Sequence, residues 1–134
     1  MRVEGARSSV DIAVSGLKAQ ALRMNVIATN IANASTSRTA GGEPYRRQDV
    51  VVHSTGGIQG VTIARVAKDT KTDFKQLLQP GHPDADANGY VKMPNIDLPV
   101  EMMNMVTATR AYQANTAVLK RYQDSVETTL ELLK

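Results

Sequence analysis

Two long patterns of apolar and small residues, one near each end of the chain, constrain the fold more than any other feature. Residues spaced alternately four and three apart fall on one stripe of an α-helix. The sequence therefore predicts an N-terminal helix that ends near Asn33 and has Ser8 or Ser9 as its N-cap. The stripe of this helix consists of Val10, Val14, Leu17, Ala21, Met24, Ala28 and Ile31.

The pattern near the C-terminus is longer and predicts a second helix. Asn95 or Asp97 is expected to cap it, Pro99 is tolerated in its first turn, and Glu101 stands where a negative charge complements the helix dipole. Several stripe positions are polar, which favours a helix with several neighbours over a two-stranded coiled coil. The stripe consists of Leu98, Met102, Met105, Thr109, Tyr112, Thr116, Leu119, Gln123, Val126, Leu130 and Leu133.

The segment between these helices predicts a small amount of β-structure. The run Val50-Val51-Val52 and the pair Val61 and Ile63 indicate two short strands, with Gly56-Gly57 and Gly60 at turn positions. Because Pro80-Gly81-His82-Pro83 excludes a helix or central strand, the stretch before Asn95 is expected to be extended.

The predicted fold is mainly α with a small β region, in which the long terminal helices pair as a coiled-coil-like bundle. Residues 1–33 form an N-terminal assembly helix, and residues 95–134 form a C-terminal assembly helix. Residues 34–94 hold a loop, a short β-hairpin and an extended segment. All three parts are expected to form one structural unit.

Composition excludes several classes of protein. The chain has 134 residues, of which 4% are aromatic, so one modest core is the most it can build. There is no cysteine, so neither a disulfide framework nor a thiolate zinc site is available. The net charge of +3 is spread without a long basic block, which argues against nucleic-acid binding. No run of roughly 20 apolar residues could cross a bilayer, and no cleavable secretory signal is expected.

A single stripe on each helix buries too little apolar surface to offset the entropy lost when so many helical residues are ordered. Further small and apolar side chains must be covered, and we expect other chains to cover them. The ends are therefore predicted to be loose in the monomer and to become ordered on assembly. These side chains are Ala13, Ala19, Ala32, Met103, Ala111, Ala114 and Ala117.

The motifs that could bind a metal, catalyse a reaction or contact phosphate are better explained by structural roles. The run Asp84-Ala-Asp86-Ala-Asn88-Gly89 matches the start of a calcium loop, but Asn95 stands where a bidentate glutamate is required. We expect a polar turn. His53 and His82 lack partners at metal-ligand spacing, and no nucleophile motif supports an enzyme. The run Tyr45-Arg46-Arg47 could contact phosphate, but a contact with a neighbouring protein is preferred.

Specific residues then resemble a known family, the flagellar basal-body rod proteins. Ser15 to Gln20, Arg23 to Ala28 and Asn30 to Asn33 resemble the N-terminal helix shared by flagellar rod and hook proteins. The narrower resemblance, to proximal-rod members, covers the chain from about residue 9 to its end. It depends on Pro44 to Arg47, Gly81 to Asp86, Gly89 to Val91, Pro94-Asn95, Glu101-Met102, Arg110 to Asn115 and Thr129 to Leu133.

The resemblance implies a non-enzymatic structural subunit of the proximal rod, the periplasmic drive shaft that transmits torque and encloses the export channel. The expected partners are copies of the chain, other rod proteins, components of the motor base and export gate, and the surrounding ring. No cofactor, metal, nucleic acid or bilayer insertion is expected. The resemblance also implies type III export without a cleaved signal peptide.

The predicted assembly interface combines apolar stripe residues with polar residues whose amides or guanidinium group can fix helix register. A helical binding module or export chaperone is the alternative, in which the stripes would hold a client helix. The interface residues are Leu17, Met24, Asn25, Asn30, Ile31, Asn33, Met105, Arg110, Tyr112, Asn115, Leu119 and Val126.

Overall fold

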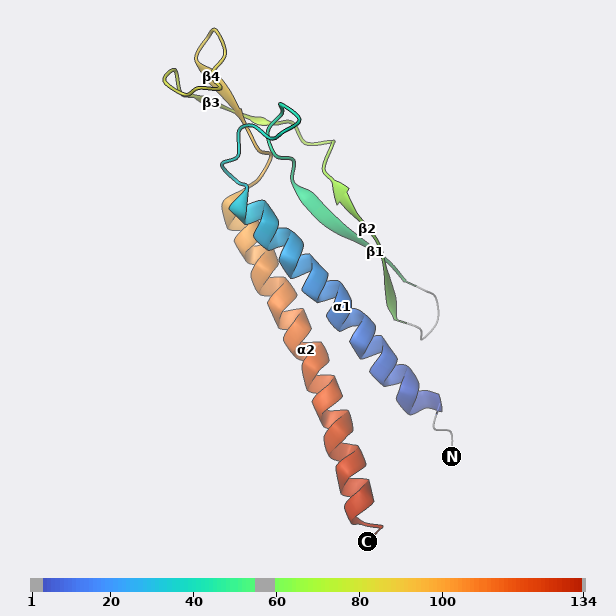
Figure 1. The fold of residues 1–134 in the computed structure, drawn as a ribbon. Coiled ribbons are helices and arrows are strands. Elements are labelled where there is room, and N and C mark those ends of the chain that lie inside the picture. Colours follow the sequence, from blue (N-terminus) through green and yellow to red (C-terminus); the bar gives the residue numbers. More distant parts are fainter. Residues whose placement is uncertain (1–3, 55–59, 134) are drawn as a thin grey trace. The chain divides into compact units, whose positions relative to one another are not determined.

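A computed structural model describes residues 4–54 and 60–133, with side chains from residue 9 onward. Figure 1 shows two long helices and short strand pairs within these ranges. The fold is mainly helical with a small β region, as the sequence predicts. In chain order the elements are α1 (Glu4–Ala32), β1 (Gln48–Ser54), β2 (Val61–Lys68), β3 (Lys75–Leu78), β4 (Tyr90–Met93) and α2 (Leu98–Glu131).

The chain divides into two compact units, each of which takes part of both helices. Unit 1 contains the start of α1, most of the β1–β2 sheet and the larger part of α2. Unit 2 contains the end of α1, the β3–β4 sheet and the start of α2. In residue numbers, unit 1 is 1–24, 50–65 and 106–134, and unit 2 is 25–49 and 66–105. The predicted division into terminal helices and a central segment stays a prediction.

The sequence predicted the C-terminal end of α1 correctly but not its N-terminal end. The helix begins at Glu4, so Ser8 and Ser9 lie inside it and the N-cap prediction was wrong. Ala and Arg residues favour a helical conformation, so α1 begins on the N-terminal side of the two serines. At the other end, the backbone N–H of Asn33 donates to the carbonyls of Thr29 and Asn30, and the helix stops at Ala32 as expected.

The start of α2 has the cap that the sequence indicates. The carboxylate of Asp97 accepts a hydrogen bond from the backbone N–H of Val100 at 3.4 Å. The backbone carbonyl of Asp97 accepts one from the backbone N–H of Glu101 at 2.9 Å. Asp97 is therefore the N-cap. Asn95, the other candidate, accepts instead from the backbone N–H of Arg47 at 2.9 Å.

In unit 1, the β1–β2 sheet packs on α1. The two strands pair, which confirms the predicted hairpin, although Gly56-Gly57 lies outside the described residues. Gly60 has a φ of 84° and lies against Ile12 and Ser15 of the helix. The hydroxyl of Ser15 accepts a hydrogen bond from the backbone N–H of Val61 at 3.2 Å. Because Gly60 carries no side chain, the strand backbone can reach the helix at this point.

This packing corrects one prediction about burial. Ala13 and Ala19 are 3% and 5% exposed within the single chain, so they do not wait for other chains to cover them. Val50 of β1, 5% exposed, is buried in the same unit. The periodicity of the helices alone does not reveal the cover that the central strands supply.

In unit 2, β3 and β4 form a second antiparallel sheet where the sequence predicted an extended segment alone. Lys75 pairs with Met93 and Leu78 pairs with Tyr90 at the two ends of the register. The prolines that exclude a central strand lie in the connection, which turns the chain between β3 and β4. Val91, at 0% exposure, anchors this sheet in the core of the unit.

Candidate assembly surface

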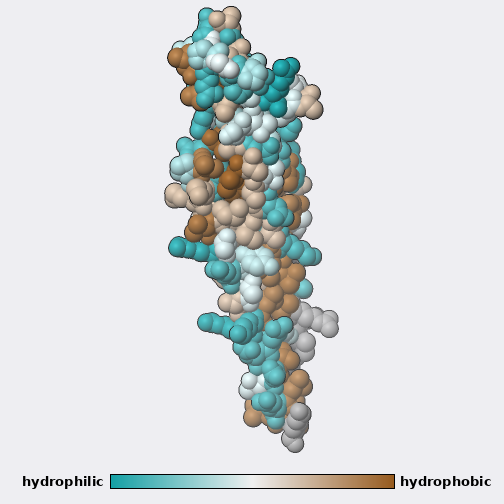
Figure 2. Space-filling model, turned by 60° about the vertical axis from the view of Figure 1, so that its left-hand side comes forward, coloured by the Kyte–Doolittle hydropathy of each residue, from teal (hydrophilic) through white to brown (hydrophobic). Residues whose placement is uncertain are grey.

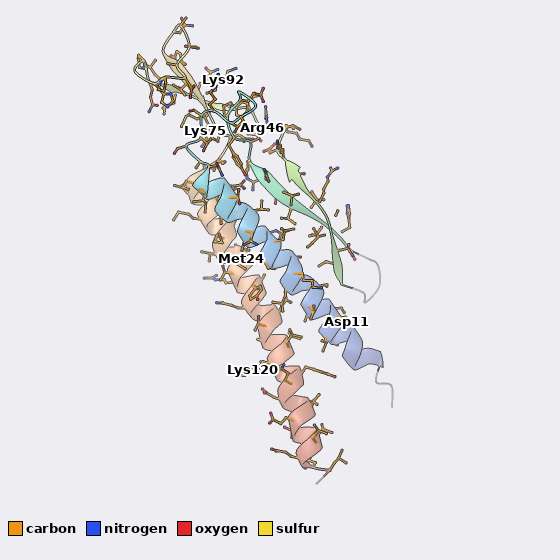
Figure 3. All side chains as sticks on the ribbon, in the orientation of Figure 1. Asp11, Met24, Arg46, Lys75, Lys92 and Lys120 are labelled. Atoms are coloured by element: carbon orange, nitrogen blue, oxygen red, sulfur yellow. The ribbon has the colours of Figure 1, made fainter. Side chains whose placement is uncertain are left out.

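In unit 1 the two helices approach closely at a glycine. A Cβ atom placed on Gly16 would lie 2.7 Å from Nδ2 of Asn115, so the amide of Asn115 occupies the space that a side chain would need. Farther along, the hydroxyl of Thr109 lies 3.5 Å from the sulfur of Met24, and Ala108 is 2% exposed. Small residues therefore allow α1 and α2 to pack closely. Figure 3 labels Met24 on α1.

In unit 2 the two helices are joined by a buried polar cluster centred on Asn30. This side chain is 0% exposed. Its amide nitrogen donates to the carbonyl of Gln48 at 2.8 Å and to the carboxylate of Glu101 at 3.1 Å. Its amide oxygen accepts from the hydroxyl of Tyr45 at 3.1 Å and from the backbone N–H of Gln48 at 3.0 Å. All these partners belong to the same chain.

Glu101 is the charged member of this cluster and is 1% exposed. Nε of Arg47 donates to its carboxylate at 2.6 Å, which makes a short charge-assisted hydrogen bond. Burial alone would lower the pKa of Arg47, but the hydrogen bond and charge of Glu101, together with Asp49, raise it above its ordinary value. Burial, followed by the charge of Glu101, raises the pKa of Tyr45. The buried carboxylate is thus paired and hydrogen-bonded.

Asn95 extends the cluster to the connection between β2 and β3. The amide nitrogen of Asn95 donates to the backbone carbonyls of Asp69 and Thr72. Arg46 donates to the same two oxygens. The guanidinium of Arg46 also lies 4.1 Å from the ring centre of Phe74. Hydrogen bonds from Thr72 and then from the backbone of Lys71 lower the pKa of the Asp69 carboxyl. This connection is therefore fixed by side chains from two sides.

The contact of Tyr45-Arg46-Arg47 with a neighbouring protein stays a prediction, and the structure shows what these residues bind within the chain. Tyr45 and Arg47 bind Asn30 and Glu101, and Arg46 binds the turn after β2. The sequence carried one signal for this cluster, the acidic residue in the first turn of α2. Its partner lies 54 residues away, so spacing alone could not identify it.

The residues of the predicted interface differ in exposure, and their contacts with other subunits stay a prediction. Asn30 is buried and engaged within the chain. Asn33 donates to the carbonyl of Thr29 and accepts from Thr36, which is the alternative capping role. Leu17, Met24, Ile31, Asn33, Met105, Asn115 and Leu119 are half-buried, and Asn25, Arg110, Tyr112 and Val126 are exposed.

The outer part of α2 presents a ridge of exposed apolar side chains, which we call the α2 ridge. From residue 120 to residue 131 every side chain of this helix is exposed. Figure 2 shows hydrophobic surface in several patches on the side of the molecule that it presents. The α2 ridge consists of Val118, Tyr122, Val126 and Leu130.

The motif that resembles a calcium loop forms a polar turn, as predicted. Asp84 accepts hydrogen bonds from Ser37 at 2.8 Å and from Arg38 at 3.4 Å, and Asp86 accepts from the backbone N–H groups of Asn88 and Tyr90. Within the described ranges, no group of three or more potential metal-ligating side chains comes together. In the same ranges, neither helix has an apolar stretch long enough to cross a membrane.

Two family models match parts of this chain. A family model described as flagella basal body rod protein matches residues 11–38. A second, described as the C-terminal part of the flagellar basal body rod FlgEFG proteins, matches residues 87–132. The first match covers most of α1 and the turn after it, and the second covers β4 and α2.

Curated relatives are similar along almost the whole chain. The flagellar basal-body rod protein FlgC of Borreliella burgdorferi is 40% identical over 97% of this chain and 99% of its own length. The FlgC protein of Salmonella typhimurium is 42% identical over 91% of this chain and 93% of its own. That of Bacillus subtilis is 34% identical over 94% and 97%.

Proposed function

The chain belongs to the flagellar basal-body rod proteins, and on this premise we propose that it is a structural subunit of the proximal rod. Several relatives that match more than nine-tenths of the chain are named FlgC. In this function the terminal helices polymerise with copies of the chain and with other rod proteins. The resulting tube transmits torque and encloses the export channel.

The observation that carries the proposal is the α2 ridge. Its residues lie four apart along one face of α2, and each is at least 36% exposed within the described chain. A helix with an apolar stripe stabilises itself by burying that stripe against another helix. Neighbouring subunits in a polymer would supply that cover. A mechanical role also fits the buried polar groups, which bind one another within the described part of the chain.

The remaining features of the proposal concern place and chemistry. We place the subunit in the basal body on the periplasmic side, next to the motor base, the export gate and the surrounding ring. It would reach this position through the flagellar export channel without a cleaved signal peptide. The rod role requires no catalysis and no cofactor, because packing between subunits is sufficient to carry torque.

Assembly with sibling rod proteins tests this function. The purified chain is mixed at high concentration with its sibling rod subunits, and particles are followed by electron microscopy while helicity is followed by circular dichroism. We expect rod-like assemblies and a gain in helical signal. Val126→Asp, which places a charge on the α2 ridge, should prevent assembly, whereas Lys120→Asp at another exposed position of the helix should reduce it much less.

Two outcomes would contradict the proposal. A helical monomer that forms no ordered assembly with any sibling would exclude a rod subunit. Binding of a single client helix with one-to-one stoichiometry would favour the helical binding module or export chaperone instead.

A further inference from the structure

Unit 2 contains an open groove of about 440 Å³, and all of its lining residues lie outside the two helices. One wall is the segment from Ser37 to Pro44, and the other is the β3–β4 sheet with its connecting turn. Lining residues on the sheet include Gln76, Tyr90 and Lys92. Figure 3 labels Lys92 beside these strands.

The carboxylates that line the groove are already engaged. Asp84 accepts from the hydroxyl of Ser37 and the guanidinium of Arg38, and these contacts hold the two walls together. The hydrogen bond from Ser37, followed by the hydrogen bond and charge of Arg38, lowers the pKa of the Asp84 carboxyl. Asp86 accepts from two backbone N–H groups at 2.9 Å. The acidic groups of the groove thus serve its construction.

The donors on the sheet are not engaged in this way. Gln76 pairs with Lys92 in the strand register, and Leu78 pairs with Tyr90, so these side chains share one face of the sheet. Within the described part of the chain, the side chains of Gln76, Tyr90 and Lys92 have no hydrogen-bond or ion-pair partner. Together they offer an ammonium, a phenolic O–H and an amide NH₂. Such a set suits a carboxylate, which only accepts hydrogen bonds.

The surroundings of these donors indicate a peptide. Leu78 and Tyr90 are 57% and 43% exposed and lie opposite each other, which forms an apolar platform on the same face. In addition, β3 pairs with β4 alone among the described strands, and each of its residues is exposed. A free strand edge can pair with the backbone of an extended segment, while pockets on the sheet select its side chains.

We propose that this groove binds an extended segment of a neighbouring rod subunit, with an acidic side chain of that segment on Lys92, Tyr90 and Gln76. This inference rests on the proposed rod function and adds a second contact to the one made by the helices. The helices would supply the common packing of the polymer. The groove would select which neighbour lies beside unit 2.

Substitution of Lys92 in the full-length chain tests the groove. Lys92→Met retains the aliphatic stem and removes the charge, and Lys71→Met is the matched control, because Lys71 is an exposed lysine of the same unit outside the groove. Affinity for each sibling subunit is measured by sedimentation of mixed assemblies. We expect Lys92→Met to weaken binding to one sibling about fivefold, as an exposed charge pair contributes up to about that factor, and Lys71→Met to leave it unchanged.

A second measurement examines the free protein, so that a failure of the groove is distinguishable from a failure of the rod function. Acetyl-Leu-Glu-amide and acetyl-Leu-Gln-amide are titrated into the isotope-labelled chain, with amide shifts recorded by NMR. We expect shifts at Gln76, Tyr90 and Lys92 with the glutamate peptide alone, and their loss in Lys92→Met.

The two measurements distinguish failure of the groove from failure of the rod function. Normal assembly of Lys92→Met with every sibling, together with no peptide shifts, would overturn the groove and leave the rod function intact. Binding of free succinate as strongly as the glutamate peptide would also overturn it, because the groove would then recognise a small carboxylate. Failure of the unsubstituted chain to assemble would contradict the rod function, while the peptide shifts would still report on the groove.

Discussion

The helices α1 and α2 have similar lengths but very different surroundings. Along α1, the buried side chains Ala13, Ala19, Val26, Ile27 and Asn30 extend over most of the helix. Along α2, only Glu101 and Ala108 are buried among the described residues, and the helix is fully exposed from residue 120 to residue 131. In unit 1, α1 packs against both α2 and the β1–β2 sheet, and in unit 2 its Asn30 binds Gln48 and Glu101.

This difference divides the work between the helices. Since α1 is largely satisfied within the chain, its substitutions should act first on the stability of the subunit. Since α2 carries the α2 ridge, its outer substitutions should act first on assembly. The following predictions test that division, beginning with the largest effect.

Loss of the Glu101 carboxylate should have the largest effect on the free chain. Glu101→Ala leaves Arg47 and Asn30 without their buried partner, and removal of one member of a buried ion pair costs about 3–5 kcal/mol of unfolding free energy. Urea denaturation followed by circular dichroism measures this loss. The double substitution Arg47→Met with Glu101→Met should restore part of the stability. A loss below about 1 kcal/mol for Glu101→Ala would show that the start of α2 does not depend on this cluster.

Substitution of Gly60 tests whether the β1–β2 sheet covers α1. Gly60→Ala combines a φ of 84° with a clash against Ser15 of the helix, so we expect a loss of about 2 kcal/mol in unfolding free energy. Gly81→Ala is the control, because a Cβ there meets no atom within 4 Å. Equal stability of the two variants would mean that the cover of α1 does not need this close approach.

A charge on the α2 ridge should separate assembly from stability. Val126 is 41% exposed, so Val126→Asp should change the unfolding free energy of the free chain by less than about 0.5 kcal/mol. The same variant should bind sibling subunits at least about tenfold more weakly, which corresponds to about 1.4 kcal/mol. Thermal unfolding and co-sedimentation provide the two readings. A large loss of stability without loss of assembly would reverse the roles assigned to the helices.

Protonation of Asp84 in unit 2 should produce the smallest effect. The pKa of Asp84 in the folded chain lies below its ordinary value of 3.8, because of Ser37 and then Arg38. The stability from this carboxylate is therefore fully present above 3.8 and is lost as pH falls through the lower folded value. NMR titration should show the pKa of Asp84 moving up towards 3.8 in Ser37→Ala. An unchanged pKa in that variant would remove Ser37 as the cause.

Local patterns were sufficient for the helices, the first hairpin and the turn at Asp86. They were not sufficient for the contacts between distant segments. Asn30 was selected as a polar contact, but its partners Gln48 and Glu101 lie 18 and 71 residues away, and no spacing rule connects them. The same limit applies to Arg47, which looks in the sequence like an exposed basic residue at a strand edge.

The sequence by itself determined that both ends are helical, that a hairpin lies between them, and that the chain resembles flagellar rod proteins, because periodicity and motifs are local properties. Only the tertiary structure decided which faces are covered. It placed the β1–β2 sheet against α1, buried Glu101 on Arg47 and left the α2 ridge exposed. Burial depends on which segments meet in space, and that information is shared among residues far apart in the chain.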